Sequence, residues 1–165
     1  MSNIGRRSLL LAAAATLAGC GFELRRAPEL HFRSIQLTGF PPRSPLADEL
    51  RTSINSSKTT LAVETAAQAQ VVFEAITDAR ERSVVAITAA GQVRELQLRA
   101  RLNFRLRTQA GKELIPATEI LLSRDMSYSE TAALAKEQEE AQLFRAMQSD
   151  IVAQVMRRLA AVQAL

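Results

Sequence analysis

Apolar and polar residues alternate almost without fault between Glu95 and Arg107. One face of this segment holds only apolar side chains: Leu96, Leu98, Ala100, Leu102, Phe104 and Leu106. The other face holds only polar ones: Glu95, Gln97, Arg99, Arg101, Asn103, Arg105 and Arg107. A period of two belongs to a strand and not to a helix. Because a typical strand has about 5–6 residues, this long one predicts an extended antiparallel hairpin with one buried face and one polar face.

Two neighbouring segments supply the predicted partners of this strand. From Val71 to Ile87 the odd positions are mainly apolar, and Thr88 to Gly91 provides a turn into the alternating segment. A second turn at Ala110-Gly111-Lys112 precedes a third, less regular strand from Ile115 to Tyr128. Pro116 indicates an edge strand or an irregular start, because proline cannot donate a hydrogen bond to a neighbouring strand.

One short strand and one helix are predicted before the hairpin. Residues His31 to Thr38 alternate over a few positions, and the Gly-Phe-Pro-Pro sequence that follows ends the strand. Ser44 followed by Pro45 matches a helix N-cap with proline in the first helical position. This helix is expected to end near Ser56, and its apolar face consists of Leu46, Leu50 and Ile54.

The last predicted element is a long helix from about Ala132 to Val162. Its acidic residues come early and its arginines late, the order that the helix dipole favours. Its apolar stripe consists of Phe144, Met147, Ile151, Val155, Leu159 and Val162. The predicted order of elements is therefore strand, helix, three strands and helix.

The N-terminal segment Met1–Gly19 is typical of a secretory signal peptide, with Arg6 and Arg7 followed by a short apolar run. The pair of arginines fits both the general secretory route and the twin-arginine route. Leu17-Ala18-Gly19-Cys20 resembles the bacterial lipobox, which implies that Cys20 carries a covalent lipid and becomes the new N-terminus. Cys20 is the only cysteine of the chain.

These features divide the chain into residues 1–19 as signal peptide, 20–29 as the lipidated cysteine with a linker, and 30–165 as one domain. The residue after the cysteine is Gly21 and not aspartate, which favours sorting to the outer membrane over retention in the inner membrane. We therefore expect a domain on the periplasmic side of the outer membrane, held to that membrane by a lipid anchor.

Composition argues against catalysis. The one histidine, His31, lies in a predicted edge strand, and no spacing of residues fits a metal site. Aromatic residues make up 4% of the chain, too few for a surface that stacks nucleic acid bases. The sequence therefore predicts a binding or assembly protein with no catalytic residues, no metal, no nucleic acid partner, and no cofactor besides the lipid on Cys20.

Six segments of the chain carry a family resemblance: Leu122 to Tyr128, Ala133 to Ala141, Arg145 to Gln148 and Arg157 to Leu159, together with Cys20 to Arg25 and Glu95 to Leu98. They resemble the lipopolysaccharide-assembly lipoprotein family LptE, also called rare lipoprotein B, and the resemblance covers essentially the whole chain after the signal peptide. The resemblance implies an α+β, two-layer sandwich with two helices packed on one face of a four-stranded, mixed and largely antiparallel sheet. The order of elements predicted from the alternation agrees with this fold.

The resemblance also implies a partner, because LptE proteins plug the β-barrel LptD and help deliver lipopolysaccharide to the outer leaflet of the outer membrane. The predicted helix-free face of the sheet suits a polar barrel wall or an anionic glycolipid. Its candidate partner-facing residues are Arg99, Arg101, Arg105 and Arg107. The alternatives are a solvated face protected from aggregation by charge, and a lipid-anchored ligand-binding or envelope-structural module that has no barrel partner.

Two further residues are candidates for lipopolysaccharide binding. Lys136 matches a basic residue that the family carries near the start of the last helix. In the turn between the long strands, where the family can carry another basic residue, this chain has Ala89 and Ala90, and Arg94 is the nearest substitute. The alternative for Lys136 is a local ion pair with Glu140, one helical turn later.

Overall fold

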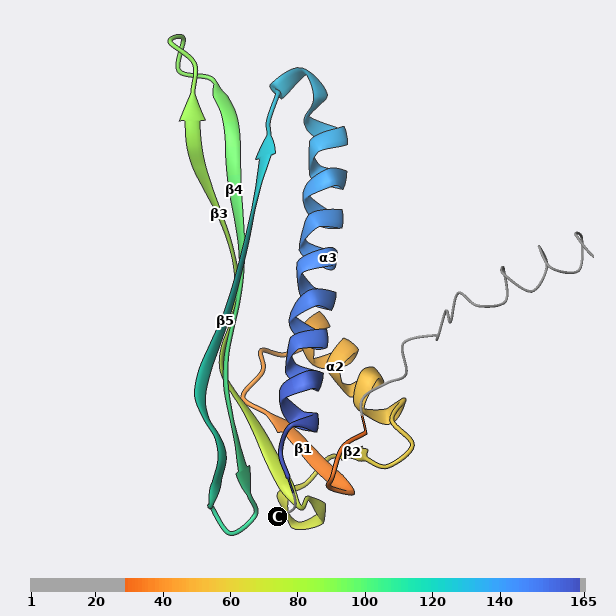
Figure 1. Ribbon diagram of the computed structural model, residues 1–165. Coiled ribbons are helices and arrows are strands. Elements are labelled where there is room, and N and C mark those ends of the chain that lie inside the picture. The colour runs from red at the N-terminus through yellow and green to blue at the C-terminus, as the bar shows by residue number, and fades with distance from the viewer. Residues whose placement is uncertain (1–28, 164–165) are drawn as a thin grey trace, which may run out of the picture.

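The long hairpin organises the computed structural model, which describes residues 29–163 (Figure 1). Strands β3 (Val71–Ile87), β4 (Val93–Thr108) and β5 (Glu113–Ser127) form an antiparallel meander. Strands β1 (Ser34–Thr38) and β2 (Leu61–Val63) extend the same sheet by parallel pairing, in the order β2-β1-β3-β4-β5. The fold class is α+β with a mixed sheet, as predicted.

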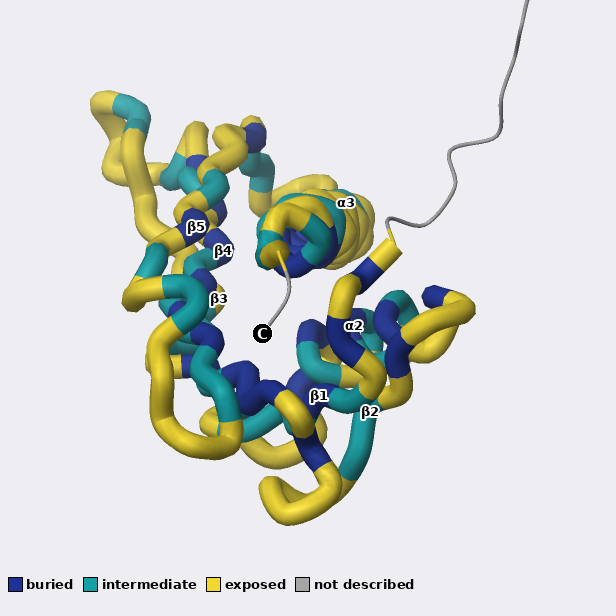
Figure 2. Tube along the Cα trace, turned by 60° about the horizontal axis from the view of Figure 1, so that its bottom comes forward, coloured by how far each residue is buried: buried dark blue, intermediate teal, exposed yellow. Residues whose placement is uncertain are grey.

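Two helices lie on one side of this sheet, which curves around them (Figure 2). Helix α2 (Pro45–Asn55) begins as predicted, because the hydroxyl of Ser44 accepts a hydrogen bond from the amide of Ala47 at 3.2 Å. Helix α3 (Ala133–Ala160) runs along β4 and β5 and contacts α2. Two short 3-10 turns, η1 (Ala66–Gln68) and η2 (Glu130–Ala132), precede β3 and α3.

The predicted apolar faces meet in one core. All six apolar residues predicted to face the core from β4 are buried, as are the three predicted on α2. On α3, five of the six predicted stripe residues are buried, and Val162 packs against the core just beyond the end of the helix. The helices therefore cover one face of the sheet and leave the other face without a covering layer among the described residues.

The sheet has five strands and not the four predicted. The additional strand, β2, has only three residues, pairs with β1 and follows α2 directly. Three residues are too few to show a period of two, so the pattern of apolar positions could not reveal this strand. The hydroxyl of the buried Thr60 donates a hydrogen bond to the carbonyl of Phe32, which joins the start of β2 to the segment before β1.

Strand β3 does not keep one apolar face along its length. A register shift between Ala75 and Thr77 leaves Ile76 as an extra residue opposite β4, and such a bulge exchanges the faces of the residues that follow, up to a second register shift between Val84 and Ala86. Beyond it, Asp78, Arg80 and Arg82 lie on the helix side, paired across the sheet with the buried apolar residues of β4. The odd-position face predicted for the whole strand is therefore wrong between Ile76 and Val84.

Gly39 ends the parallel pairing between β1 and β3. Its φ is +81°, and a Cβ at this position would lie 2.1 Å from the carbonyl oxygen of Ala75. Only glycine allows both the left-handed conformation and this close approach of two backbones. Beyond the pairing of Thr38 with Glu74, no strand described in the structure covers this edge of β3.

We predict that Gly39→Ala destabilises the protein by about 2–5 kcal/mol, the sum of about 1–2 kcal/mol for the left-handed conformation and about 1–3 kcal/mol for overpacking. Gly111→Ala is the matched control, because Gly111 has φ +90° but no atom near the added Cβ. The free energy of unfolding of this control is expected to fall by only about 1–2 kcal/mol. Urea unfolding of both variants measures the difference, and equal losses would contradict the close approach at Gly39.

Candidate functional site

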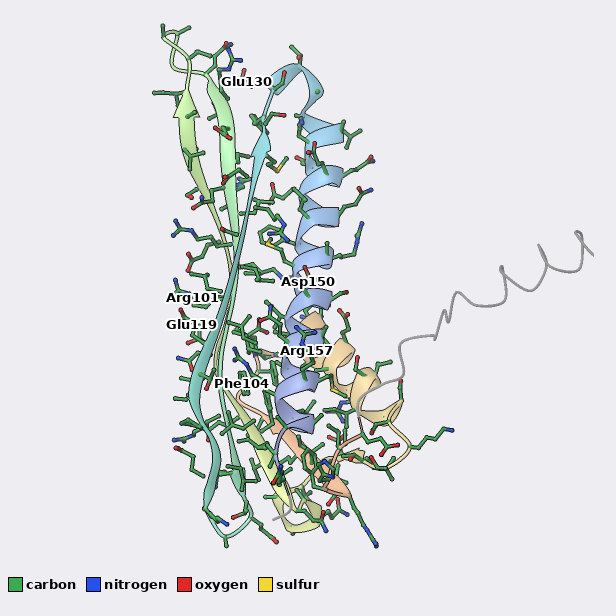
Figure 3. The ribbon with its side chains drawn as sticks, viewed as in Figure 1. Arg101, Phe104, Glu119, Glu130, Asp150 and Arg157 are labelled. Atoms are coloured by element: carbon green, nitrogen blue, oxygen red, sulfur yellow. The ribbon has the colours of Figure 1, made fainter. Side chains whose placement is uncertain are left out.

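The helix-free face of the sheet carries the four arginines predicted to face a partner. All four lie on β4, at the positions between its buried residues. Figure 3 shows Arg101 and Glu119 on the side of the sheet away from α3, whereas Phe104 lies between sheet and helix. We call this helix-free face of β3, β4 and β5 the outer face. The structure thus brings the predicted arginines together in one row.

Acidic residues of the neighbouring strands accompany this row. The strand register places six of them on the outer face: Glu74, Glu81, Glu95, Glu113, Glu119 and Asp125. With four arginines against six carboxylates, the outer face is a mosaic of both charges and not a basic patch. A polar wall that presents charges of both signs fits such a mosaic better than a purely anionic surface.

Arg105 is the arginine most fully engaged within the sheet. Its Nε and one terminal nitrogen donate to the two carboxylate oxygens of Glu74 at 2.9 and 3.0 Å, a bidentate arrangement. Arg107 approaches the same carboxylate less closely, with its Nε 3.7 Å away. Glu74 therefore holds this end of the row in place and fixes the orientation of the Arg105 guanidinium.

Arg99 and Arg101 are held more loosely. The Nε of Arg99 donates to the side chain of Gln97 at 2.8 Å, and Gln97 donates to Asp125 at 3.0 Å. The Nε of Arg101 is 3.9 Å from Glu119, beyond hydrogen-bond distance. These two guanidinium groups can therefore donate to another surface.

Three polar atoms on the outer face of β4 lack a hydrogen-bond partner within the described residues: Arg101 Nε, Asn103 Oδ1 and Arg107 Nε. All three atoms are buried beneath their own and neighbouring side chains. A buried polar group without a partner costs about 1–3 kcal/mol, so small shifts that supply partners here would be favourable. The middle of the outer face is therefore the part of the sheet least satisfied by its own hydrogen bonds.

The two candidate lipopolysaccharide-binding residues lie at the same end of the molecule, although 42 positions separate Arg94 from Lys136 in the sequence. The end of β5 joins them. The amide of Tyr128 donates to the carbonyl of Arg94 at 2.8 Å, and the ammonium of Lys136 donates to the hydroxyl of Ser127 at 3.0 Å. A groove of about 360 Å3 lies here, lined by Thr88, Gln92, Val93, Arg94 and residues 127–131.

Lys136 has an acidic neighbour, but not the one predicted. Its ammonium lies 2.8 Å from Glu139, one residue earlier in the helix than the predicted Glu140. Glu140 pairs instead with Arg82 on β3, at 3.2 Å. The Lys136 side chain is 19% exposed, so it is held between β5 and its own helix and keeps only part of its surface open.

The bulge in β3 creates a polar junction that sequence reasoning missed. Gln148 on α3 is buried and accepts a hydrogen bond from Arg80, and its amide nitrogen donates to the carbonyl of Pro45 at 3.1 Å and to the carboxylate of Glu49 at 2.5 Å. Asp78 accepts a 2.6 Å hydrogen bond from the capping Ser44. The sequence did contain a sign of the bulge, because the apolar Ile76 directly follows Ala75 and breaks the alternation.

The described residues contain no cluster of histidine and acidic residues suited to a metal ion, and none of their helices is both long and apolar enough to cross a membrane. His31 is exposed and precedes β1. Cys20, the predicted lipidation site, lies outside the described residues.

Comparison with known proteins adds a family and a set of related folds. The family model LptE, described as "Lipopolysaccharide-assembly", matches residues 32–159. An uncharacterized lipoprotein B from Nitrosomonas europaea, solved by NMR, is 30% identical with a TM-score of 0.72, over 86% of this chain and 91% of that one. No match was found among curated proteins.

Two crystal structures share the fold at lower identity. The rare lipoprotein B from Shewanella oneidensis is 22% identical with a TM-score of 0.65, over 78% of this chain and 95% of that one. A minor lipoprotein from Acinetobacter baumannii is 17% identical with a TM-score of 0.63, over 80% of this chain and 93% of that one. In each case the shared region spans nearly all of the solved chain.

Proposed function

Because the chain belongs to the LptE family of lipopolysaccharide-assembly proteins, we propose that it assembles with the β-barrel LptD and helps deliver lipopolysaccharide to the outer leaflet. The family match confirms the resemblance seen in the C-terminal sequence. Membership gives the chain a role in lipopolysaccharide assembly and makes it an envelope lipoprotein of a non-enzymatic family. The barrel partner, the route of delivery and the residues involved are our proposals.

We place the protein at the periplasmic side of the outer membrane, anchored through a lipid on Cys20. The lipobox-like sequence and the absence of aspartate after the cysteine support this placement. Several acyl chains on one cysteine would make the attachment effectively permanent, whereas a single chain binds a membrane only marginally. The anchor would keep the domain beside the barrel throughout assembly.

The outer face is our proposed contact with LptD, and one observation carries this assignment. The helices cover one face of the sheet, while the other presents a row of partly satisfied arginines with three polar atoms that lack partners among the described residues. The interior of an outer-membrane barrel is polar, so its wall can supply acceptors for the loosely held guanidinium groups of Arg99 and Arg101. Arg99 and Arg101 are the proposed primary contacts, while Arg105 maintains the sheet through Glu74.

We predict that Arg99→Glu combined with Arg101→Glu lowers the yield of the LptD complex roughly tenfold or more, because like charges placed against a complementary surface cost several kcal/mol. The fold is expected to persist, since both side chains point away from the core. Co-purification with the barrel from detergent-solubilised outer membranes measures the yield, with circular dichroism as the folding control.

A matched pair of substitutions tests the choice of face. Arg145→Glu combined with Arg157→Glu makes the same change in charge on exposed positions of α3. This pair is expected to leave the complex nearly intact. An equal loss of complex yield from both pairs would show that net charge causes the effect. A normal yield from the Arg99 and Arg101 pair would show that the outer face does not contact LptD.

For lipopolysaccharide we propose a site at the end of the sheet formed by Arg94 and Lys136. Both cations flank the groove at the end of β5, and each can bind a phosphate of an anionic glycolipid. The exposed Leu134 near the start of α3 and Ile87 at the end of β3 add apolar surface at this end of the molecule. The arrangement offers charge and aliphatic surface together, as an amphiphilic ligand requires.

We predict that Lys136→Asp and Arg94→Glu each weaken lipopolysaccharide capture roughly tenfold, the value of one hydrogen bond to a charged group, and leave the LptD complex intact. Lys112→Asp is the control, because Lys112 lies in the exposed turn at the opposite end of β4. Pull-down on immobilised lipopolysaccharide measures capture. Normal capture by both variants would contradict the site, while loss of the barrel complex would show that the two roles are not separate.

A further inference from the structure

A second groove lies where the chain enters the described part of the fold, between the segment before β1 and the segment that leads into β2. Its volume is about 590 Å3, and its two walls are residues 30–33 and residues 57–61. This groove is separate from the outer face and from the groove beside Arg94. We call it the entry groove.

Hydrogen bonds fix both walls of the entry groove. The buried Thr60 donates to the carbonyl of Phe32, and the amide of Leu61 donates to the carbonyl of Arg33 at 2.9 Å. The amide of Arg33 in turn donates to the side chain of Gln70 at 2.6 Å. The groove is therefore formed before any ligand arrives, so a ligand would meet little entropic cost of ordering the protein.

The charge of the entry groove has one sign. Arg33 and Lys58 line it, both are exposed, and its lining holds no aspartate or glutamate. Neither cation forms an ion pair with another residue of the described range. The groove beside Arg94 differs, because Glu130 shares its lining. Two cations on a preformed groove, neither of them paired within the described range, are suited to bind phosphate groups.

An aliphatic side chain accompanies the two cations. Leu61 lies in the groove lining and is 63% exposed. Exposed aliphatic groups beside lysine and arginine are typical of surfaces that lie against a membrane, where the apolar group enters the headgroup region and the cations meet phosphates.

The length of chain before the groove places it near the predicted anchor. Nine residue-to-residue steps lead from Cys20 to Glu29, the first described residue. An extended chain spans at most about 3.3–3.6 Å per residue, so the groove cannot lie much more than about 30 Å from the lipidated cysteine. A charged surface on so short a tether meets the membrane repeatedly.

We propose that the entry groove binds the phosphate headgroups of anionic phospholipids in the membrane that holds the anchor, and so sets the orientation of the domain at that membrane. This inference rests on the lipid anchor of the proposed function. Arg33 and Lys58 contact the phosphates, and Leu61 enters the headgroup layer.

The test attaches the chain to vesicles by chemistry that does not depend on lipidation in cells. The chain from Cys20 onward is coupled through its single thiol to a maleimide lipid, in vesicles of phosphatidylcholine alone or with phosphatidylglycerol. Amide hydrogen exchange in residues 30–33 and 57–61 is the readout. We expect slower exchange on the anionic vesicles only, because each basic side chain near an anionic surface favours the docked state about fivefold.

Substitutions then assign the effect to the groove. Arg33→Gln combined with Lys58→Gln is expected to lower the ratio of docked to undocked molecules about 25-fold, the product of two such factors. Lys58→Gln alone, in a surface loop, is expected to lower the same ratio about fivefold. This single variant keeps the test valid if the double variant unfolds. Arg145→Gln on α3 is the matched control and is expected to retain the slow exchange.

Three results would overturn the proposal: equal exchange on both kinds of vesicle, equal loss in the Arg145 control, or the same slowing by inorganic phosphate on neutral vesicles. The last result would identify a site for free phosphate instead of a membrane contact. Because the coupling is chemical, a failure here leaves lipidation of Cys20 and assembly with LptD untouched. Conversely, an unlipidated protein in cells would not change this result.

Discussion

One-sided burial of β4 is the constraint on which the rest of the structure depends. Six apolar side chains on one face of this strand must be removed from water, and α3 and α2 provide the cover. Because neighbouring side chains of a strand point to opposite faces, the same burial commits the polar residues of β4 to the outer face. The row of arginines is thus a consequence of the core, and a shift of register by one residue would destroy both.

The bulge at Ile76 divides β3 into two parts that contact the helices in different ways. Before it, Phe73 and Ala75 belong to the core, and beyond it Asp78 and Arg80 bind the helices through Ser44 and Gln148. Before the bulge β3 therefore contributes apolar packing, whereas beyond it β3 attaches to the helices through polar contacts, beside the apolar face of β4 that continues along the hairpin. The far end keeps exposed aliphatic and cationic groups around Arg94 and Lys136, which suits the proposed ligand site.

The sequence sufficed to predict elements whose period is carried over many residues. Strand β4, the capped start of α2 and the stripe of α3 are present with nearly the expected bounds. Strand β2 is too short to show a period, and the single extra residue at Ile76 changes the face of β3 without changing its composition. The alternation of apolar and polar positions was enough to place the arginines on the outer face, but it could not identify the acidic residues that pair with them. Glu74 and Glu119 come from other strands, so those pairs depend on a register that no local pattern encodes.

The central claim is that the outer face, and not the helix layer, meets the barrel. Site-specific photocrosslinking in cells tests it most directly, with the photoreactive residue at Ser123 on the outer face of β5 or at Gln142 on the exposed side of α3. Crosslinks to LptD are expected from position 123, and few or none from position 142. Crosslinks from position 142 alone would contradict the account.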